Sequence, residues 1–402
     1  MKQSWEVKKL REIGIIQTGT TPPTKDKLNY GDYINFVKPA HFNLNGTINV
    51  DIEGLSEIGL KKGRLVEKDS ILMVCIGATI GKTALVDIPV SCNQQINSFT
   101  PNKNLCSKFF YYALNSDTFY KKVLDASSQA TIPIINKSKW ENLEVSFPKS
   151  FEEQKQIVEI LDKAFETIEQ AKVNIEKNIQ NSKELFQSRL TEIFSQKGNG
   201  WEEKELRKLA EFRNGLNFNK SSKGETFKIV GVSNFKDNFY VDNDRLEEVT
   251  IDGKLKELDF LEDGDIVTVR SNGNPNLIGR CMLLENIEEK ISFSGFTIRI
   301  RLIDKNIYPL FLNYFLKSSY IKNKLVKSGN GTDIRNLNQQ SLSSLVFKYP
   351  LKIEEQKKIV SEINRLSEQT KQLEKQYKQK LDNLEELKKS ILQKAFSGEL
   401  IP

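Results

Sequence analysis

The stretch Trp5–Arg11 (WEVKKLR) returns as Trp201–Arg207 (WEEKELR), 196 residues later. A second stretch, Glu152–Val158 (EEQKQIV), returns as Glu354–Val360 (EEQKKIV), 202 residues later. Two motifs that recur in the same order at nearly the same spacing indicate an internal duplication. The sequence therefore predicts two copies of one module, an arrangement that suits a reader of two similar targets held at a fixed distance.

Each copy begins with a globular segment of mixed secondary structure. Short runs of β-forming residues, broken by Gly, Pro and Asn turns, occur in both copies. They are residues 70–75, 143–147, 265–270 and 297–302. Each copy also has one aromatic segment of helical character, at 109–116 and at 310–318. These patterns predict an α+β fold class, with a small mixed sheet in each module.

A long amphipathic helix is predicted after each globular segment, because apolar residues recur there at alternating spacings of four and three. In the first helix this seam is Ile157, Leu161, Ala164, Ile168, Ala171 and Ile175. In the second it includes Ile359, Ile363, Leu366, Leu373, Leu384, Leu387 and Ile391. We expect the two helices to pair as an antiparallel coiled coil with pseudo-two-fold symmetry. Candidate partner-binding residues on them are Ile157, Leu161, Ile168, Ile359, Ile363, Leu373 and Leu387.

Helix signals set the expected domain boundaries. Ser150 and Glu153 form a candidate capping box at the start of the first helix, and Gly198 and Gly398 are expected to end the two helices. A helix of about 43 residues would be a rod of roughly 65 Å. The expected segments are globular domains at 1–150 and 198–350 and spacer helices at 151–197 and 351–402.

Composition sets broad limits on function. The 402 residues carry a net charge of +7, divided as +5 for residues 1–150, −3 for 151–195, +3 for 196–350 and +2 for 351–402. The excess positive charge of the globular segments is typical of proteins that meet a polyanion. The four cysteines form no C-x-x-C pair, and neither a membrane-spanning apolar run nor a signal-peptide core is evident. We expect a reduced, cytoplasmic protein.

One glycine-rich stretch, Gly77–Thr83 (GATIGKT), is similar to a phosphate-binding P-loop but is one residue short between its glycines. The second copy keeps only the glycine and the basic residue, as Gly279 and Arg280. A turn followed by a basic side chain is the favoured interpretation, which makes Lys82 and Arg280 candidate phosphate or base contacts. A nucleotide hydrolase that uses Lys82 and Thr83 is the alternative.

Other catalytic patterns are missing from the sequence. His41 is the only histidine, so a Ser-His-Asp triad could be built only there. No His and Cys residues have metal-ligand spacing, and no motif of amino-methyltransferases occurs. We therefore expect neither a catalytic residue, nor a metal, nor a cofactor in this chain.

Polar loops in both copies carry side chains that read base edges. Arg bonds guanine bidentately, and Asn and Gln bond adenine. The richest loops are 270–276 (RSNGNPN) and 330–336 (NGTDIRN), and 127–131 (SSQAT) occupies the matching place in the first copy. Candidate DNA contacts are Lys38, His41, Asn43, Lys82, Gln94, Ser128, Gln129, Thr131, Arg270, Asn272, Asn274, Arg280, Asn330, Thr332 and Arg335.

The whole chain resembles the specificity subunit of type I restriction–modification enzymes. The similarity rests on the two WE-x-K-x-L starts, on the exits Phe147-Pro148 and Tyr349-Pro350 into EEQK helices, and on the closing run Lys394–Leu400 (KAFSGEL). The resemblance implies two target-recognition domains, each reading half of a split double-stranded DNA site, and two helices that act as a ruler and bind two modification subunits.

The resemblance also implies that the chemistry belongs to partner subunits. Methyl transfer from S-adenosylmethionine would take place on the modification subunits, and ATP- and Mg-dependent translocation and cleavage on restriction subunits. Without the resemblance, a structural coiled-coil adaptor whose two heads bind proteins remains an alternative. Salt-dependent affinity for DNA discriminates the two interpretations.

Overall fold

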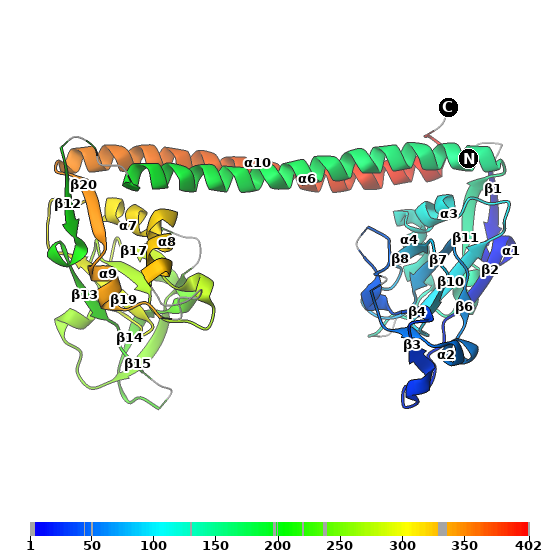
Figure 1. Ribbon diagram of the computed structural model, residues 1–402, viewed down its shortest axis with the longest axis horizontal. Coiled ribbons are helices and arrows are strands. Elements are labelled where there is room, and N and C mark those ends of the chain that lie inside the picture. The colour runs from blue at the N-terminus through cyan, green and yellow to red at the C-terminus, as the bar shows by residue number, and fades with distance from the viewer. Residues whose placement is uncertain are drawn as a thin grey trace. The chain divides into compact units, whose positions relative to one another are not determined.

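The computed structural model describes residues 5–400 except 44, 50, 129–130, 196–197, 199, 219–220, 236–238 and 329–335, and backbone only for 326–328. It divides into two compact units, residues 1–175 with 378–402 and residues 176–377. Each unit holds one globular module, which we call module 1 (residues 5–148) and module 2 (residues 201–350), and parts of two 45-residue helices (Figure 1). These helices are α6 (Phe151–Ser195) and α10 (Ile353–Ser397).

Module 1 contains three sheets. Its first and last strands, β1 (Trp5–Lys9) and β11 (Glu144–Pro148), pair antiparallel. A four-stranded antiparallel sheet has the order β2-β10-β7-β8, made of β2 (Gly14–Thr18), β10 (Ile96–Pro101), β7 (Ser70–Val74) and β8 (Thr83–Val86). The third has the order β3-β5-β4-β9-β6, made of β3 (Tyr30–Gly31), β5 (Gly54–Leu55), β4 (Ile34–Val37), β9 (Val90–Cys92) and β6 (Leu65–Val66).

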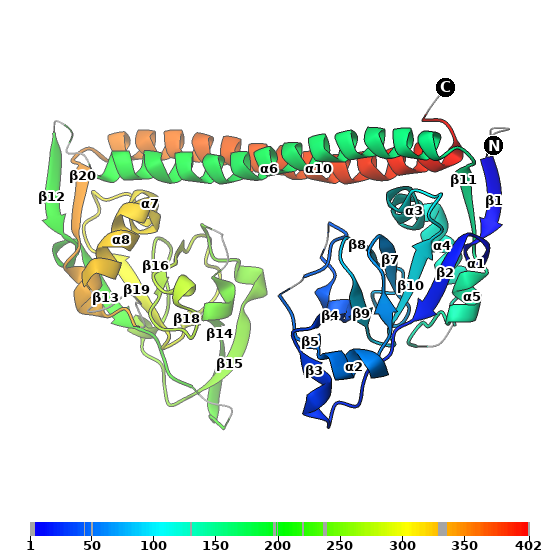
Figure 2. The same ribbon diagram turned by 45° about the vertical axis from the view of Figure 1, so that its right-hand side comes forward.

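The helices of module 1 are short. They are α1 (Leu10–Ile13), η1 (Lys27–Asn29), η2 (Pro39–His41), α2 (Glu57–Lys62), α3 (Ser107–Leu114), α4 (Asp117–Ala126) and α5 (Lys137–Glu141). Figure 2 shows α3 between the strands of the module and the long helices. Phe109 and Phe110 of α3 are fully buried in one core with Ile157 and Leu161 of α6. Burial of these large side chains fixes the first turns of α6 on the module.

Module 2 repeats this plan. Strands β12 (Trp201–Glu205) and β20 (Val346–Pro350) pair antiparallel. The four-stranded sheet has the order β13-β19-β16-β17, made of β13 (Ala210–Asn214), β19 (Thr297–Leu302), β16 (Ile266–Val269) and β17 (Cys281–Leu283). A further sheet has the order β15-β14-β18, made of β15 (Glu247–Asp252), β14 (Gly224–Val230) and β18 (Ile291–Phe293).

The last three helices of module 2 correspond in order to the last three of module 1, and the short helices before them differ in position. The helices of module 2 are η3 (Leu206–Lys208), η4 (Val232–Asn234), η5 (Asn243–Arg245), η6 (Glu257–Asp259), η7 (Pro275–Leu277), α7 (Pro309–Lys317), α8 (Ser319–Ser328) and α9 (Gln339–Ser343). Trp5 meets Phe109 and Trp201 meets Phe311, each pair edge to face with ring centroids 6.2 Å apart. The predicted α+β class and the internal duplication are therefore confirmed.

The glutamine of each EEQK motif explains why the motif is repeated. The Gln154 side chain donates to the Pro148 carbonyl at 2.9 Å and accepts from the Cys106 N–H at 2.8 Å. Gln356 makes the same two contacts in module 2, with the Pro350 carbonyl at 2.9 Å and the Tyr308 N–H at 2.8 Å. Both side chains are fully buried. Each glutamine thus joins the last strand of its module to the first turn of the long helix.

Replacing Gln356 with alanine is expected to destabilise unit 2 by about 2 kcal/mol, because the buried Tyr308 N–H and Pro350 carbonyl lose their partner. Lys357→Ala is the matched control, since that exposed side chain pairs only with Glu354 of the same turn. Urea unfolding of the full chain, followed by circular dichroism, measures both. Equal midpoints for the two variants would contradict the role of Gln356.

The long helices begin and end close to the predicted residues. The Ser150 hydroxyl accepts from the Glu153 N–H at 3.3 Å, as expected of a cap, but the Glu153 carboxylate accepts from the Trp5 indole N–H at 3.2 Å. The capping box is therefore only half formed. Helix α10 stops before Gly398, whose φ of 82° is the left-handed conformation of a helix C-terminus.

The predicted seam residues divide into two groups. Ile157, Leu161, Ile168 and Ile363 are at most 4% exposed and Ile359 is half-buried, all within the cores of their own units. Leu373 and Leu387 are 43% and 47% exposed. Within unit 1, Lys172 of α6 also pairs with Glu385 of α10. The buried group packs inside the chain, so only Leu373 and Leu387 of the candidate partner-binding residues offer apolar surface to another subunit.

Candidate nucleic-acid interface

The β7–β8 loop (residues 75–82) of module 1 is closed by backbone hydrogen bonds. The Val74 N–H donates to the Lys82 carbonyl at 2.9 Å, and the Gly81 N–H donates to the Val74 carbonyl at 2.8 Å. The Cys75 N–H donates to the Gln95 carbonyl at 2.8 Å, which ties the loop to the turn between β9 and β10. The loop is therefore held at both ends by the sheet.

The β16–β17 loop (residues 270–280) of module 2 has the same three bonds. The Val269 N–H donates to the Arg280 carbonyl at 2.9 Å, and the Gly279 N–H donates to the Val269 carbonyl at 2.9 Å. The Arg270 N–H donates to the Phe296 carbonyl at 2.8 Å, in the turn between β18 and β19. Both modules thus share one backbone arrangement of loop and neighbouring turn, which we call the frame, and place different side chains on it. The equivalent positions are Cys75 and Arg270, Lys82 and Arg280, and Gln95 and Phe296.

In module 1 the structure brings Lys82 to the predicted segment 38–43. The Lys82 ammonium donates to the Phe42 carbonyl at 2.8 Å, so the base of the β7–β8 loop and this segment form one surface. Asn43 is exposed beside it. Lys38 lies at the edge of the same segment and lines a cleft of about 780 Å³ together with Lys27. Lys38 and Lys82 are both half-buried, and Asp32 and Glu53 line the same cleft as Lys38.

His41 acts as a structural acceptor in this surface. Its Nδ1 accepts from the Lys38 N–H at 3.1 Å. Burial, together with the neighbouring Lys38, lowers the pKa of His41, so the imidazole is neutral near pH 7. Burial likewise raises the pKa of Cys75 to about 11, which keeps that thiol protonated. Neither group is poised for acid–base or nucleophilic chemistry.

The remaining candidates of module 1 lie on two neighbouring segments. Gln94 is exposed in the β9–β10 turn and accepts from the Thr21 hydroxyl. Ser128 exchanges hydrogen bonds with the backbone of Ile134. The neighbouring Pro133 carbonyl accepts from the Gly77 N–H of the β7–β8 loop at 3.1 Å. Residues 131–134 thus border the β7–β8 loop. Thr131 is exposed there, and Gln129 lies outside the described residues.

In module 2 the β16–β17 loop holds four of the predicted reading residues, Arg270, Asn272, Asn274 and Arg280. The Arg270 guanidinium donates to the Gly295 carbonyl at 3.5 Å, and the Arg280 Nε donates to the Asn276 carbonyl at 3.2 Å. The Asn272 side chain accepts from the Asn274 N–H at 2.8 Å, a local turn that shapes the loop. Asn330, Thr332 and Arg335 lie outside the described residues.

The loop Gly77–Thr83 does not have the geometry of a P-loop. It joins two antiparallel strands, β7 and β8, whereas a P-loop joins a strand to a helix whose N-terminus binds phosphate. Its lysine is turned to the Phe42 carbonyl. The nucleotide-hydrolase alternative is therefore wrong for this loop.

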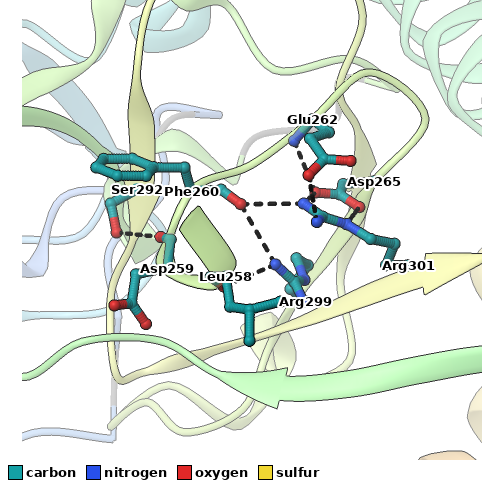
Figure 3. Close-up of polar contacts among 8 residues, drawn as sticks. All are labelled: Leu258, Asp259, Phe260, Glu262, Asp265, Ser292, Arg299 and Arg301. Atoms are coloured by element: carbon teal, nitrogen blue, oxygen red, sulfur yellow. Dashed lines mark hydrogen bonds and ion pairs between the residues drawn. The ribbon is translucent and has the colours of Figure 1, made fainter. Parts of the chain in front are cut away.

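A charged network anchors the strand that follows the β18–β19 turn (Figure 3). Arg299 of β19 is 1% exposed and donates to the Leu258 carbonyl at 2.9 Å and the Phe260 carbonyl at 3.3 Å. Burial lowers the pKa of its guanidinium. Arg301 of the same strand binds both oxygens of Asp265 at 2.8 and 2.7 Å, a contact that raises the pKa of Arg301. Module 1 has a hydroxyl pair in the place of this ion pair, Ser70 with Thr100 at 2.7 Å.

One exposed residue of the frame, Phe296, escaped the sequence-based site, whereas Gln95 belongs to the polar run 93–95 that the sequence favours for base contacts. Gln95 and Phe296 are both exposed, and Phe296 shows 61% of its surface. Gln95 lies in a run of amide side chains, a residue type that pairs with base edges. Phe296 follows Gly295 between two apolar strands, and an aromatic residue in such a run is normally assigned to the core.

The described residues were also considered for metal ligands and for membrane spans. Within the part of the chain that the structure describes, no three His, Cys, Asp or Glu side chains gather as metal ligands would. Among the described helices, none combines the length and the apolar character that a membrane span needs.

Comparison with known proteins places the chain in a family. A family model described as "Type I restriction modification DNA specificity domain" matches residues 2–181 and 198–383. The chain is 25% identical to the type I restriction enzyme StySPI specificity subunit of Salmonella potsdam, over 100% of this chain and 90% of that relative.

Two solved structures share the fold. A chain described under "Structural basis underlying complex assembly and conformational transition of the type I R-M system" gives a TM-score of 0.76 at 16% identity, covering 100% of this chain and 99% of that one. The HsdS subunit from Thermoanaerobacter tengcongensis gives 0.61 at 18% identity, covering 100% and 98%. With two matched copies that span most of its length, the chain belongs to the family of type I restriction–modification DNA specificity domains.

Proposed function

We propose that each module of this specificity subunit reads one half of a split double-stranded DNA site. The observation that carries the proposal is the shared backbone frame, whose equivalent positions hold Cys75 and Gln95 in module 1 but Arg270 and Phe296 in module 2. Equal frames present base-reading groups in the same manner, and different side chains select different bases. The proposed contacts are the candidates of each module, from Lys38 to Thr131 in module 1 and from Arg270 to Arg335 in module 2.

The two long helices are proposed to pair antiparallel as a coiled coil and to set the distance between the half-sites. Contacts inside the units support the pairing, since Lys172 meets Glu385 in unit 1 and Leu190 shares a core with Val360 in unit 2. A helix of 45 residues is about 68 Å long. The domain boundaries that follow are recognition domains at 1–150 and 198–350 and spacer helices at 151–197 and 351–402.

The chemistry is proposed to take place on other subunits. Two modification subunits would dock on the helices through exposed apolar residues such as Leu373 and Leu387, together with Val173 and Leu185, which are 58% and 63% exposed. Those subunits would supply S-adenosylmethionine and the methylation of adenine, and restriction subunits would supply ATP and Mg. This chain would contribute no catalytic residue and would act in the cytoplasm.

Selection of DNA from a randomised pool tests the proposal. The chain, assembled with its modification subunits, is expected to select two short conserved blocks separated by a gap of constant length and random sequence. Raising the salt concentration should weaken binding to every DNA, since phosphate contacts release counterions. A single uninterrupted block, or no selected sequence from a fully assembled complex, would contradict it.

Replacing Arg270 with alanine should relax only one of the two blocks. The loss of a guanidinium that reads a base edge costs about 1–3 kcal/mol at one position. Arg280→Ala is the comparison, because a phosphate contact weakens binding to all sequences about equally. Titration of each variant against half-site mutants measures the difference. Equal loss of discrimination in both blocks would refute independent modules.

A further inference from the structure

Phe296 is a solvent-exposed aromatic residue on a rigid turn. It shows 61% of its surface, while the strand residues on either side, Phe293 and Ile298, are fully buried. A single exposed apolar residue is ordinary on a protein surface. Two further features distinguish Phe296: the backbone that holds it and its equivalent in module 1.

The turn that carries Phe296 is fixed on three sides. The Phe296 carbonyl accepts from the N–H groups of Arg270 at 2.8 Å and Ser271 at 3.3 Å. The Gly295 N–H donates to the Leu216 carbonyl at 2.7 Å, and the Thr297 N–H closes the turn on the Ser294 carbonyl at 2.8 Å. The phenyl ring therefore projects from a backbone that has little freedom to withdraw it.

Close packing around the turn supports this rigidity. A Cβ atom at Gly215 would lie 2.3 Å from the carbonyl oxygens of Phe293 and Ser294, so only glycine fits beneath the turn. Module 1 has the same arrangement, since a Cβ atom at Gly19 would lie 2.2 Å from the Asn93 oxygen. In both modules a glycine backbone thus packs against this turn. The exposed residue that follows, Gln95 or Phe296, is held in a fixed position.

The equivalent residue of module 1 is Gln95, whose carbonyl accepts from Cys75 as that of Phe296 accepts from Arg270. One frame therefore offers an amide in module 1 and an apolar ring in module 2. In the major groove, an amide pairs with the edge of adenine, whereas the only apolar group on a base edge is the C5-methyl group of thymine. The Phe296 carbonyl also accepts from the N–H of Arg270, the proposed reader of guanine, so the two residues are neighbours in the frame.

We propose that Phe296 is a specificity-determining residue that contacts the C5-methyl group of a thymine in the half-site read by module 2, and that Gln95 holds the equivalent reading position in module 1. This inference rests on the proposed function. The contact is apolar and small, so it discriminates thymine from cytosine and from uracil but contributes little to overall affinity.

Uracil substitution isolates the methyl group without changing base pairing. The assembled complex is titrated against its selected site with each thymine of the module 2 half-site replaced in turn by uracil. At one position we expect about a fourfold loss of affinity, the effect of one buried methyl group. Phe296→Ala should lose the same factor on the natural site and should no longer respond to uracil there.

Three controls keep the outcome interpretable. Phe296→Leu keeps an apolar contact and should still respond to uracil. Gln95→Ala should change the affinity only for the half-site read by module 1. Phe296→Ala should bind the half-site of module 1 with unchanged affinity, which would show that this exposed substitution leaves the protein folded.

Two kinds of result would overturn the inference. One is a module 2 half-site without thymine, or one in which no uracil weakens binding. The other is a response to uracil that persists in Phe296→Ala. Both results leave a selected split site in place, so they are distinguishable from failure of the proposed function, in which no such site is selected and this inference falls with it.

Discussion

Replacing Asp265 with alanine is expected to destabilise module 2 by about 3 kcal/mol, because it breaks a largely buried ion pair and leaves the Arg301 guanidinium with the more exposed Glu262 carboxylate and the Phe260 carbonyl as partners. Asp265 is 1% exposed and Arg301 17%. The same carboxylate also accepts from the Glu262 N–H at 2.8 Å, so the substitution removes three hydrogen bonds at once. The measurement is hydrogen exchange of the β16 and β19 amides in the full chain, with the module 1 amides as an internal reference.

Module 1 supplies the matched control for this prediction. Its strand register places Ser70 opposite Thr100, as Asp265 stands opposite Arg301, and the two hydroxyls meet at 2.7 Å. The double variant Asp265→Ser with Arg301→Thr should therefore be more stable than Arg301→Thr alone, which leaves a buried carboxylate. Additive losses in the double variant would show that the two residues are not coupled.

Inserting one heptad into both long helices is expected to abolish recognition of the original site and to create a site with a longer gap. Seven residues add about 10 Å to an α-helix, which corresponds to about 3 base pairs at 3.4 Å each. Seven residues are close to two helical turns, so the apolar seam stays on one face. Suitable positions are after Lys177 in α6 and after Lys378 in α10. Sequencing of DNA selected by the assembled complex gives the new gap.

Two controls accompany the insertion. Inserting the heptad into α6 alone should disrupt the pairing of the helices, since they then differ in length. This variant should bind neither the original site nor the site with the longer gap. Inserting four residues into both helices should rotate the apolar seam out of register and weaken the pairing of the two helices. The two half-site sequences should be unchanged in the paired insertion, and an unchanged gap would show that the helices do not set the spacing.

The secondary structure of this chain followed closely from local patterns. Runs such as 70–75 and 297–302 became β7 and β19, and the aromatic segments became α3 and α7. The helix seam was less reliable. A repeat of 3.5 residues drifts around a helix of 3.6 residues per turn, so Leu373 and Leu387 occupy seam positions by spacing yet remain exposed.

The equivalence of the two frames could not be found by spacing. Cys75 and Arg270 are 195 residues apart, Lys82 and Arg280 are 198 apart, and Gln95 and Phe296 are 201 apart. Loops of different length change the offset at each step, and only the hydrogen bonds of the strands reveal which residues correspond. For the same reason, the sequence placed Arg270 in a reading loop but gave no sign that Cys75 stands in its place in module 1.

The most direct test of two modules reading two half-sites is a map of methylated adenines across a host genome that expresses this chain with modification subunits from its own genetic neighbourhood. We expect one split motif, methylated at all its occurrences, and, when module 2 is exchanged for that of another specificity subunit, a second split motif that shares one block with the first. No new methylation by a complex verified as assembled, or a motif without an unread gap, would contradict it.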